Sequence, residues 1–296
     1  MKQNDIVVLT TAFRQDSSFT EDFFQSLKNQ TRTDFDLLLL DDGAEGLESF
    51  VSRYSTLNVI QIPGKNNIAK NREELINSAI KMGYSKAVFA DFDDRLSENR
   101  IEISAALLDV EVIVVNDVIL FSGASVQPKG HFAGFLNEGQ RVDLGLILES
   151  NFLGMSNTAV RLDNLNRVNF DSGLKAVDWF FFSSLLAEKK GAIFTGRCKT
   201  FYRQHSHNLS NIGKVSVEQL HNEIKVKKHH YSLMVNRAAE YKSLLLAVSD
   251  FCENLEDVSL ANRIINDSKS KKTPFWWNIF NEKEYWIIKN EINKKS

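Results

Sequence analysis

Short apolar runs alternate with amphipathic segments over the first part of the chain. Ile6–Leu9, Leu37–Leu40, Val59–Ile62 and Ala87–Ala90 are each bounded by polar or turn-forming residues, and Val112–Leu120 is a further strand candidate. A run as short and continuous as Leu37–Leu40 is typical of a strand that is covered on both faces, and Ile6–Leu9 is a candidate for a buried strand. The pattern therefore predicts several strands.

The segments between these runs have the periodicity of helices. Thr20-Glu21-Asp22 marks the expected start of one helix, which has Phe19, Phe23, Phe24 and Leu27 on one face. A second helix is expected from about 67 to 82, with Gly83 as its C-terminal cap, and Ser97 is expected to cap a third. Strands that alternate with helices predict an α/β fold with a mostly parallel central sheet flanked by helices.

The pattern changes along the rest of the chain. Residues 121–144 contain several glycines and predict loops or an edge hairpin, and residues 179–190 predict a helix. Beyond about residue 215 the sequence is mostly helical and rich in Lys, Glu and Asn. We therefore expect a main domain over 1–214 and a helical C-terminal extension over 215–296.

Composition narrows the class of protein. Of the 296 residues, 43% are hydrophobic and 25% are charged, as in ordinary soluble globular proteins, and a net charge of −2 gives no reason to expect nucleic acid as a partner. Cys198 and Cys252 fit no metal-binding spacing, so reduced thiols are expected. No run reaches the roughly 18 apolar residues that a membrane span needs, so we expect a cytoplasmic protein.

Two acidic clusters follow predicted strands. Asp41 and Asp42 come after one apolar run, and Asp91, Asp93 and Asp94 come after another. Open parallel sheets bind ligands outside the carboxyl ends of their strands, so both clusters can face one crevice. Carboxylates packed closely repel each other unless a cation compensates them, and Mg²⁺ and Mn²⁺ prefer such oxygen ligands. The alternative is that these are ordinary turn and capping aspartates.

At this point the sequence resembles the family 2 glycosyltransferases, which have the GT-A fold. The matching segments stand in the family's order and cover about two thirds of the chain: Ile6–Arg14, Ser26–Thr31, Leu40-Asp41-Asp42-Gly43, Ala69-Lys70-Asn71, Phe89–Asp94, Val177-Asp178-Trp179 and Tyr202–His205. Two elements depart from the usual pattern, because Thr10–Phe13 replaces Pro-Thr-Tyr-Asn and Val177 replaces Glu. The resemblance implies a nucleotide-binding half over about 1–120 and an acceptor-binding half over about 121–214.

The resemblance also implies roles for individual residues. The nucleotide would be held by Thr11, Asp41, Asp42, Lys70 and Asp91. A Mn²⁺ or Mg²⁺ ion on the diphosphate would be bound by Asp93 and Asp94, with His205 reaching it from a loop. Because a carboxylate can accept from a pyrimidine imide N–H, uracil or thymine is preferred as the base, and a UDP-sugar is the favoured donor. The metal would offset the charge that builds on the leaving diphosphate.

Asp178 matches the catalytic base of the family. It would take a proton from the acceptor hydroxyl, and direct displacement would invert the anomeric carbon. Asp178 precedes the apolar run Trp179–Phe182, so desolvation is expected to raise its pKa towards a range useful to a base. The alternative is a helix N-cap aspartate, and one carboxylate could serve both purposes.

Four further residues are assigned to acceptor binding or to a loop that closes over the diphosphate. They are Ser156, Arg203, His207 and Ser210. For Ser156, the alternative is a core strand with a glycine bulge at Gly154. For His207, it is a solvated polar loop.

Two features outside these motifs stay open. Residues 225–230 are rich in Lys and His and predict a solvated helix face, with contact to an anionic lipid-linked acceptor as the weaker alternative. The aromatic segment Phe275–Phe280 predicts core packing, while an oligomer contact or a peripheral anchor at the inner membrane face stays open.

The sequence thus predicts an inverting, metal-dependent hexosyltransferase. It would move a sugar from a nucleoside-diphosphate donor to a saccharide or lipid-linked acceptor, and members of the resembled family commonly act in bacterial surface polysaccharide synthesis. A non-catalytic scaffold or regulatory subunit with the same fold is the main alternative. A nucleotidyltransferase ranks last, because the loop Thr10–Arg14 has no glycine.

Overall fold

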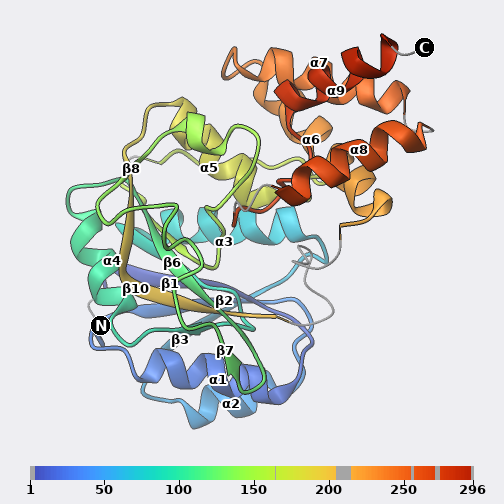
Figure 1. Cartoon of the computed structure of the whole chain (residues 1–296). Coiled ribbons are helices and arrows are strands. Elements are labelled where there is room, and N and C mark those ends of the chain that lie inside the picture. The colour runs from blue at the N-terminus through green and yellow to red at the C-terminus, as the bar shows by residue number, and fades with distance from the viewer. Residues whose placement is uncertain (1–3, 164, 205–214, 255–256, 271–273, 295–296) are drawn as a thin grey trace. The chain divides into compact units, whose positions relative to one another are not determined.

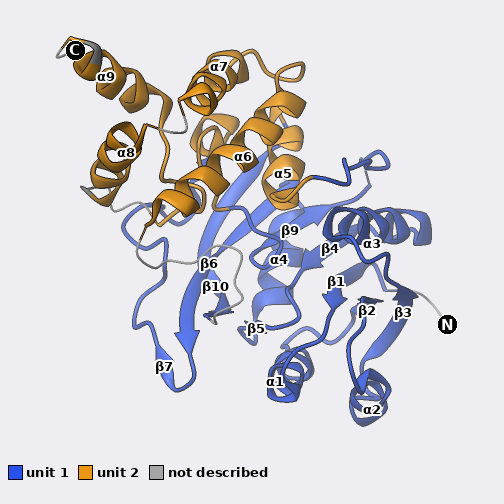
Figure 2. Cartoon of the chain, turned by 90° about the vertical axis from the view of Figure 1, so that its right-hand side faces the viewer, with its two compact units in different colours: residues 1–142, 153–173, 190–205 blue, residues 143–152, 174–189, 206–296 orange. Residues whose placement is uncertain are grey.

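The computed structural model describes residues 4–163, 165–204, 215–254, 257–270 and 274–294. The chain forms two compact units, coloured separately in Figure 2. The first contains residues 1–142, 153–173 and 190–205, and the second contains 143–152, 174–189 and 206–296. Two segments before residue 214, namely 143–152 and 174–189, thus group with the C-terminal helices, and the domain boundary near 214 stays a prediction.

Among the residues that the structure describes, the first unit is built on one sheet of ten strands, in the order β3-β2-β1-β4-β9-β6-β10-β5, with β7 paired to β6 and β8 paired to β10. The strands are β1 Ile6–Ala12, β2 Asp36–Asp41, β3 Asn58–Pro63, β4 Lys86–Phe89, β5 Arg95–Leu96, β6 Ile113–Ser122, β7 Ser125–Val126, β8 Arg141–Val142, β9 Thr158–Arg161 and β10 Ala192–Arg203. Strands β3, β2, β1 and β4 are parallel, as are β6 and β10, while β9 is antiparallel to both of its neighbours. The longer ladders are the parallel ones, which confirms the predicted fold class.

Helices cover both faces of this sheet. They are α1 Ser17–Lys28, α2 Leu47–Arg53, α3 Ile68–Met82 and α4 Arg100–Leu108. Helices α1 and α2 lie on one face and α3 on the other (Figure 1). Alternate residues of β1, such as Ile6 and Val8, join a core cluster with Phe23 of α1, while Val7 and Leu9, which point the other way, are equally buried. Burial on both faces explains why β1, β2 and β4 have continuous apolar runs, whereas the edge strand β3 is only partly buried.

Two helix starts differ from the sequence-based expectation. Helix α1 begins at Ser17 rather than near Thr20, because Asp16 is its N-cap and accepts from the Ser18 N–H at 2.8 Å. Helix α4 begins after Asn99, and Ser97 does not cap it; instead the Ser97 hydroxyl accepts from the Lys199 N–H at 2.9 Å. Helix α3 follows the prediction, with Gly83 as its C-cap at φ 82°.

The second unit is helical where the structure describes it. It contains the short 3-10 helix η1 Leu144–Ile147 and the α-helices α5 Val177–Ala187, α6 Val217–Met234, α7 Tyr241–Glu253, α8 Val258–Ser270 and α9 Glu282–Asn293. A capping box of Ser216 and Gln219 starts α6. Among the helices that the structure describes, none is both long enough and apolar enough to cross a membrane.

The basic segment 225–230 of α6 is only partly solvated. The predicted solvated face was wrong for Lys227 and His230, which are buried. Lys227 is fully buried and its ammonium lies 3.0 Å from the Glu223 carboxylate. Glu223 accepts from the Phe280 N–H at 2.9 Å, and Lys227 donates to the Phe280 carbonyl. His230 is also buried; burial lowers its pKa to about 3, and its ring stacks on Trp179 at 4.3 Å. Of the lysines in this segment, Lys225 and Lys228 are exposed.

Removing the Lys227 charge should therefore destabilise the second unit strongly. Lys227→Met leaves Glu223 buried without its partner, so we expect the free energy of unfolding to fall by about 3–5 kcal/mol. Lys228→Met, one residue along on the exposed side, is the matched control and should change little. Urea denaturation of both variants measures the difference, and equal effects would contradict the buried ion pair.

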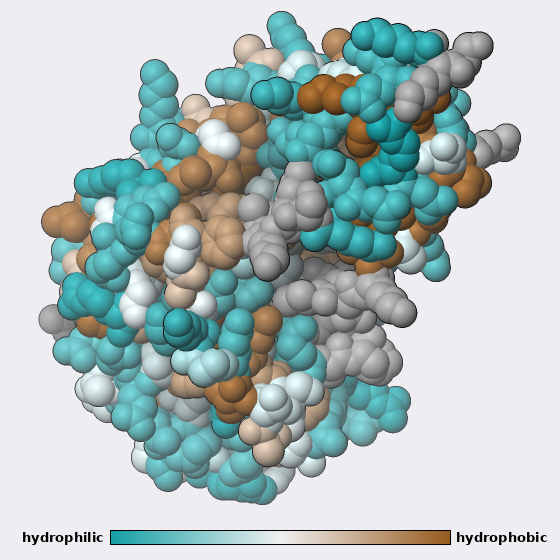
Figure 3. Space-filling view, in the orientation of Figure 1, coloured by the Kyte–Doolittle hydropathy of each residue, from teal (hydrophilic) through white to brown (hydrophobic). Residues whose placement is uncertain are grey.

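The C-terminal aromatic segment packs inside the second unit. Phe280 is buried, and the Phe275 ring lies 4.8 Å from that of Phe152. This confirms core packing for Phe280. On the face shown in Figure 3, hydrophilic side chains predominate and hydrophobic ones lie among them in small groups. Scattered exposed apolar side chains of this kind are normal on protein surfaces.

Candidate functional site

The first acidic turn lies where β1, β2 and β3 end. The Asp42 N–H donates to the Ala12 carbonyl at 2.7 Å, and the Gly64 N–H donates to the Asp41 carbonyl at 2.7 Å. These bonds tie the ends of three parallel strands together. Asp41 and Asp42 therefore lie at the carboxyl edge of the sheet, as the sequence predicts.

Both carboxylates of this turn are oriented by backbone N–H groups. The Asp41 carboxylate accepts from Gly43 and Ala44 at 3.0 Å each, and the Asp42 carboxylate accepts from Asn66 at 3.0 Å. A Cβ atom at Gly64 would lie 2.6 Å from an Asp42 carboxylate oxygen, so only glycine fits there without displacement. The turn is thus closely packed, and its side chains are only half-buried.

Thr11 lies in β1, opposite Leu40 of β2 and next to the strand end. Its hydroxyl oxygen is buried and has no hydrogen-bond partner among the described residues. Buried polar groups are nearly always paired, so a buried hydroxyl with spare hydrogen-bonding capacity needs an explanation. A bound polar ligand at this edge would supply one.

The second acidic turn follows β4 at the same edge. The Ala90 N–H donates to the Leu9 carbonyl of β1 at 3.1 Å, and the Asp94 N–H closes a turn onto the Asp91 carbonyl at 3.2 Å. Strand β1 lies between β2 and β4 and is parallel to both. The structure therefore brings Asp41, Asp42 and the turn Asp91–Asp94 to one edge of one sheet, with β1 between them.

Asp91 forms an ion pair with Arg72 of α3, a residue that the sequence analysis did not single out. Lys70, at the start of the same helix, pairs with Glu73 at 2.8 Å and lies 3.4 Å from the Asn169 side chain. Glu73 also accepts from the Phe170 N–H at 2.7 Å. The first two turns of α3 thus place two cations beside the carboxyl edge of the sheet, and one of them, Arg72, contacts the acidic turn directly.

Asp94 points inward and holds the acidic turn in place. Its carboxylate accepts from the Arg203 N–H at 2.8 Å and from the Ser156 hydroxyl, and it is 1% exposed. Burial raises the pKa of Asp94 well above its usual range, and the charges of Asp93 and Asp91 raise it further. Ser156, which the sequence assigned to the acceptor, therefore contacts the acidic turn.

The Arg203 side chain is a second support for this turn. Its guanidinium donates to the Asp93 carbonyl at 2.8 Å and to the Asp22 carboxylate of α1 at 2.6 Å. It also lies 4.0 Å from the centre of the Phe19 ring. The structure thus gives Arg203 a structural role at the end of β10, and a contact with acceptor or diphosphate stays a prediction.

Replacing Asp94 by asparagine should have an effect on stability that depends on pH. An amide can accept from Arg203 and donate to Ser156 without burying a charge, so we expect Asp94→Asn to be at least as stable as the native protein at pH 8. Because the pKa of Asp94 is raised in the native fold, the ionised carboxylate destabilises the native protein at high pH. Protonation removes this destabilisation as pH falls. The advantage of Asp94→Asn should therefore shrink towards about pH 4.

Thermal unfolding of both proteins between pH 4 and pH 8 measures this difference. Asp94→Ala is the comparison variant: it also lacks the carboxylate but leaves the Arg203 N–H unpaired, so it should be about 1–3 kcal/mol less stable than Asp94→Asn at every pH. A stability difference between Asp94→Asn and the native protein that does not change with pH would contradict the buried, protonatable carboxylate.

Arg100 is a buried cation beneath the acidic turn. It is fully buried and donates to the Phe89 carbonyl at 2.6 Å, and burial lowers its pKa to about 10. The charges of Asp94 and Asp91 favour its protonated form. Arg100 therefore compensates part of the negative charge that gathers at the end of β4.

Asp178 belongs to the second unit. Helix α5 begins at Val177, so Asp178 lies inside the first turn and is not the N-cap. One carboxylate oxygen accepts from the Trp179 N–H at 2.8 Å, and the other lies 3.4 Å from the Asn151 amide nitrogen. The side chain is half-buried, and a helix N-terminus favours a negative charge at this position.

Three predicted site residues, His205, His207 and Ser210, lie outside the described residues. Within the part of the chain that is described, no group of three or more His, Cys, Asp or Glu side chains could hold a metal ion. Mg²⁺ is commonly bound by one or two carboxylates together with substrate phosphates and water, rather than by a cage made of protein alone. The half-buried carboxylates of Asp91 and Asp93 suit a hard cation of this kind.

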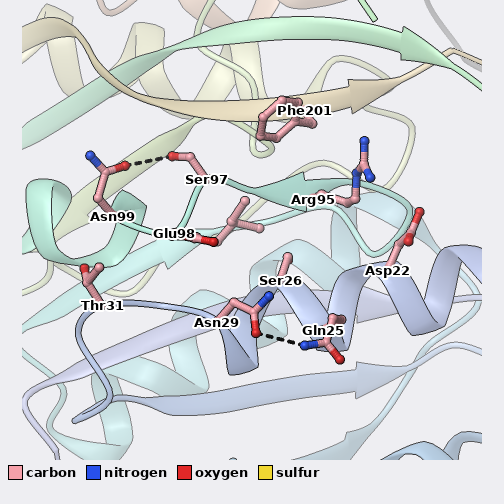
Figure 4. A pocket seen from close by; sticks show the side chains of 11 residues that line it. Asp22, Gln25, Ser26, Asn29, Thr31, Arg95, Ser97, Glu98, Asn99 and Phe201 are labelled. Atoms are coloured by element: carbon pink, nitrogen blue, oxygen red, sulfur yellow. Dashed lines mark hydrogen bonds between the residues drawn. The ribbon is translucent and has the colours of Figure 1, made fainter. Parts of the chain in front are cut away.

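A separate groove lies between α1 and the segment Arg95–Asn99 (Figure 4). Its polar side chains largely bond one another: Gln25 donates to Asn29 at 2.8 Å, and Ser97 donates to Asn99 at 3.0 Å. The predicted site residues that the structure describes are not among those lining it. We therefore assign it no part in donor binding.

Comparison with solved structures defines the class of the fold. Proteins with the same arrangement of strands and helices are glycosyltransferases, so the chain has the GT-A fold. S. aureus TarS (residues 1–349) in complex with UDP-GlcNAc matches 82% of this chain and 72% of its own, with 19% identity and a TM-score of 0.61.

Two other structures match at lower identity. GalNAc-T7 with UDP, GalNAc and Mn²⁺ matches 82% of this chain and 50% of its own, with 14% identity and a TM-score of 0.56. The mannosyltransferase PcManGT from Pyrobaculum calidifontis, in complex with GDP-Man and Mn²⁺, matches 92% of this chain and 77% of its own, with 12% identity and a TM-score of 0.55. No protein-family model and no curated protein sequence matches the chain.

Proposed function

We propose that the chain is an inverting, metal-dependent glycosyltransferase that uses a nucleoside-diphosphate sugar, with UDP-sugars favoured. The observation that carries the proposal is the pair of acidic turns, Asp41-Asp42 and Asp91–Asp94, on either side of β1 at the carboxyl edge of a GT-A sheet. Ligands of open α/β sheets bind at this edge. Solved structures of the same fold are complexes with UDP-GlcNAc or with GDP-Man and Mn²⁺.

The first acidic turn is the proposed site for the base and ribose of the donor. Asp41 and Asp42 supply acceptors for N–H and O–H groups, and the unpaired Thr11 hydroxyl supplies a buried donor or acceptor beside them. Lys70 lies at the start of α3, where it can turn from Glu73 towards a phosphate. These groups bind and orient the nucleotide, and contribute no bond-making step.

The second acidic turn is the proposed metal site. Asp93, as the sequence predicts, would hold Mn²⁺ or Mg²⁺ together with the diphosphate, and Asp91, which the sequence assigned to the nucleotide, would join it. Asp94, which the sequence assigned to the metal, is buried and bonded to Arg203 and Ser156, so we propose that it orients the turn from within. When bound, the cation supplies stabilisation of the negative charge on the departing nucleoside diphosphate. Arg72 and Arg203 keep the turn in position before any ligand arrives, which reduces the reorganisation needed during reaction.

Asp178 is the proposed base. Its carboxylate takes the proton of the acceptor hydroxyl while that oxygen bonds to the anomeric carbon and the bond from that carbon to the diphosphate oxygen breaks. One displacement of this kind inverts the configuration of the anomeric carbon. The backbone N–H of Trp179 and the side-chain amide of Asn151 each contact one carboxylate oxygen, which orients the carboxylate.

From the family resemblance, we propose that the acceptor is a saccharide or a lipid-linked saccharide. It would belong to bacterial surface polysaccharide synthesis at the cytoplasmic face of the membrane. The test is a screen of UDP-, GDP- and dTDP-sugars with Mn²⁺, measuring nucleoside diphosphate released with and without acceptor sugars. Release with one donor that stops on addition of EDTA supports the proposal. No release with any donor, together with stable co-purification of a partner, would support the scaffold alternative.

A further inference from the structure

Asn151 is a fully buried residue whose side chain lies beside Asp178. Its amide nitrogen is 3.4 Å from one Asp178 carboxylate oxygen, while the Trp179 N–H donates to the other oxygen at 2.8 Å. The amide nitrogen, rather than its oxygen, faces the carboxylate, which is the attractive orientation. Each oxygen of Asp178 thus has an N–H donor of its own.

The backbone of Asn151 is fixed by the C-terminal segment. The Asn151 N–H donates to the Trp276 carbonyl at 2.9 Å, and the Trp276 N–H donates back to the Asn151 carbonyl at 2.8 Å. This exchange is an isolated antiparallel bridge, reinforced next to it by the ring contact of Phe152 with Phe275. The position of the Asn151 side chain therefore depends on residues more than a hundred positions away.

The segment Trp276–Phe280 is itself held by buried charges. Glu223 accepts from the Ile279 N–H and the Phe280 N–H, both at 2.9 Å, and Lys227 donates to the Phe280 carbonyl. Both charged side chains are almost fully buried and pair with each other at 3.0 Å. Charge-assisted hydrogen bonds to backbone groups in a buried setting are strong and geometrically specific.

Helix α5 is fixed on its other side by Trp179. The indole N–H donates to the Ile147 carbonyl at 2.6 Å, and the ring stacks on the neutral, buried His230 of α6. The start of α5 thus lies between two anchors, the indole of Trp179 and the amide of Asn151. The Trp179 anchor depends on Ile147 of η1 and on His230 of α6, and the Asn151 anchor depends on its backbone bonds to Trp276.

We propose that Asn151 is a positioning residue for Asp178, and that the segment Trp276–Phe280 holds Asn151 in place for this task. The inference rests on the proposed function, because it supplies a partner for the proposed base. The amide N–H fixes the orientation of the carboxylate. The C-terminal extension is then part of the catalytic apparatus rather than a separable appendage.

Steady-state kinetics with the full chain test this role. Asn151→Ala should lower kcat about tenfold, equivalent to about 1.4 kcal/mol, while the KM for the donor stays unchanged. Asn151→Asp has the same shape but places a second negative charge beside Asp178, so it should lower kcat more, about a hundredfold. Asn254→Ala, which removes an amide donor to a backbone carbonyl of α7, is the control and should keep the native kcat.

Two kinetic results would overturn the inference. One is an Asn151→Ala enzyme with the native kcat. The other is a higher KM for the donor with an unchanged kcat, because that pattern belongs to a donor-binding residue.

A thermodynamic cycle separates this inference from the proposed function. Urea unfolding is measured for Asn151→Ala, Asp178→Ala and the double variant, and no catalysis is needed. We expect Asn151→Ala to cost less stability when Asp178 is already replaced, since the two side chains interact. Additive effects would overturn the contact. Non-additive effects in a chain that transfers no sugar would place the failure in the proposed function instead.

Discussion

Asp178→Asn should reduce the kcat for sugar transfer by about 10²–10⁴-fold, the contribution that a positioned general base typically makes. The amide has nearly the shape of the carboxylate and can keep the contact with the Trp179 N–H, so α5 should stay folded. It cannot take up the acceptor proton at neutral pH. Nucleotide affinity, measured by calorimetry, should stay at the native level because Asp178 is proposed to act on the acceptor alone.

The control for this variant is an exposed aspartate of the first unit. Asp163→Asn removes the same charge from the chain at an exposed position and should leave kcat unchanged. Transfer by Asp178→Asn at the native rate would show that another group is the base. A parallel loss of nucleotide affinity would show instead that the residue acts in donor binding.

Asp93→Asn should abolish the dependence of nucleotide binding on Mn²⁺ and lower transfer by about 10²–10³-fold. The expected size follows from the several kcal/mol that a cation contributes to charge stabilisation, at about 1.4 kcal/mol per tenfold change in rate. An amide is a weaker ligand for a hard cation than a carboxylate, although it preserves the turn. The measurement is initial rate against Mn²⁺ concentration.

Asp34→Asn is the matched control, because Asp34 is 66% exposed in its ion pair with Arg32 and lies at the opposite end of β2. Its rate should follow the native curve. An Asp93→Asn enzyme that needs no more Mn²⁺ than the native protein would remove Asp93 from the proposed metal site.

The centre of the fold was predictable from the sequence because β1, β2 and β4 are buried on both faces, whereas β3 at the edge of the sheet is only partly buried. Leu37–Leu40 could hardly be anything but a strand once Asp41-Asp42-Gly43 ended it, and the structure gives β2 as Asp36–Asp41. Helix starts were less predictable, since a side chain such as Ser97 can cap a helix or bond a distant strand equally well. Ser97 accepts from Lys199, and no local pattern reveals a contact across 102 positions.

The acidic turns were predictable for the same reason, since they follow strands that local patterns identify. The contacts that hold these turns in place were not predictable. The Arg203 pair with Asp22 joins residues 181 positions apart, and Arg72 and Arg100 act on the turn through contacts that only the folded chain creates. Lys227 shows the converse, because a charged residue within a basic run is fully buried once Glu223 and the Phe280 backbone surround it.

The central claim is that the carboxyl edge of β1, β2 and β4 binds a nucleoside diphosphate through a divalent cation. The most direct test is a calorimetric titration of the full chain with UDP, GDP and dTDP, once with Mn²⁺ and once with EDTA. We expect saturable binding of one nucleoside diphosphate with Mn²⁺, and we expect this binding to disappear with EDTA and in Asp93→Asn. Binding of the same strength in EDTA, or no binding of any of the three with Mn²⁺, would contradict it.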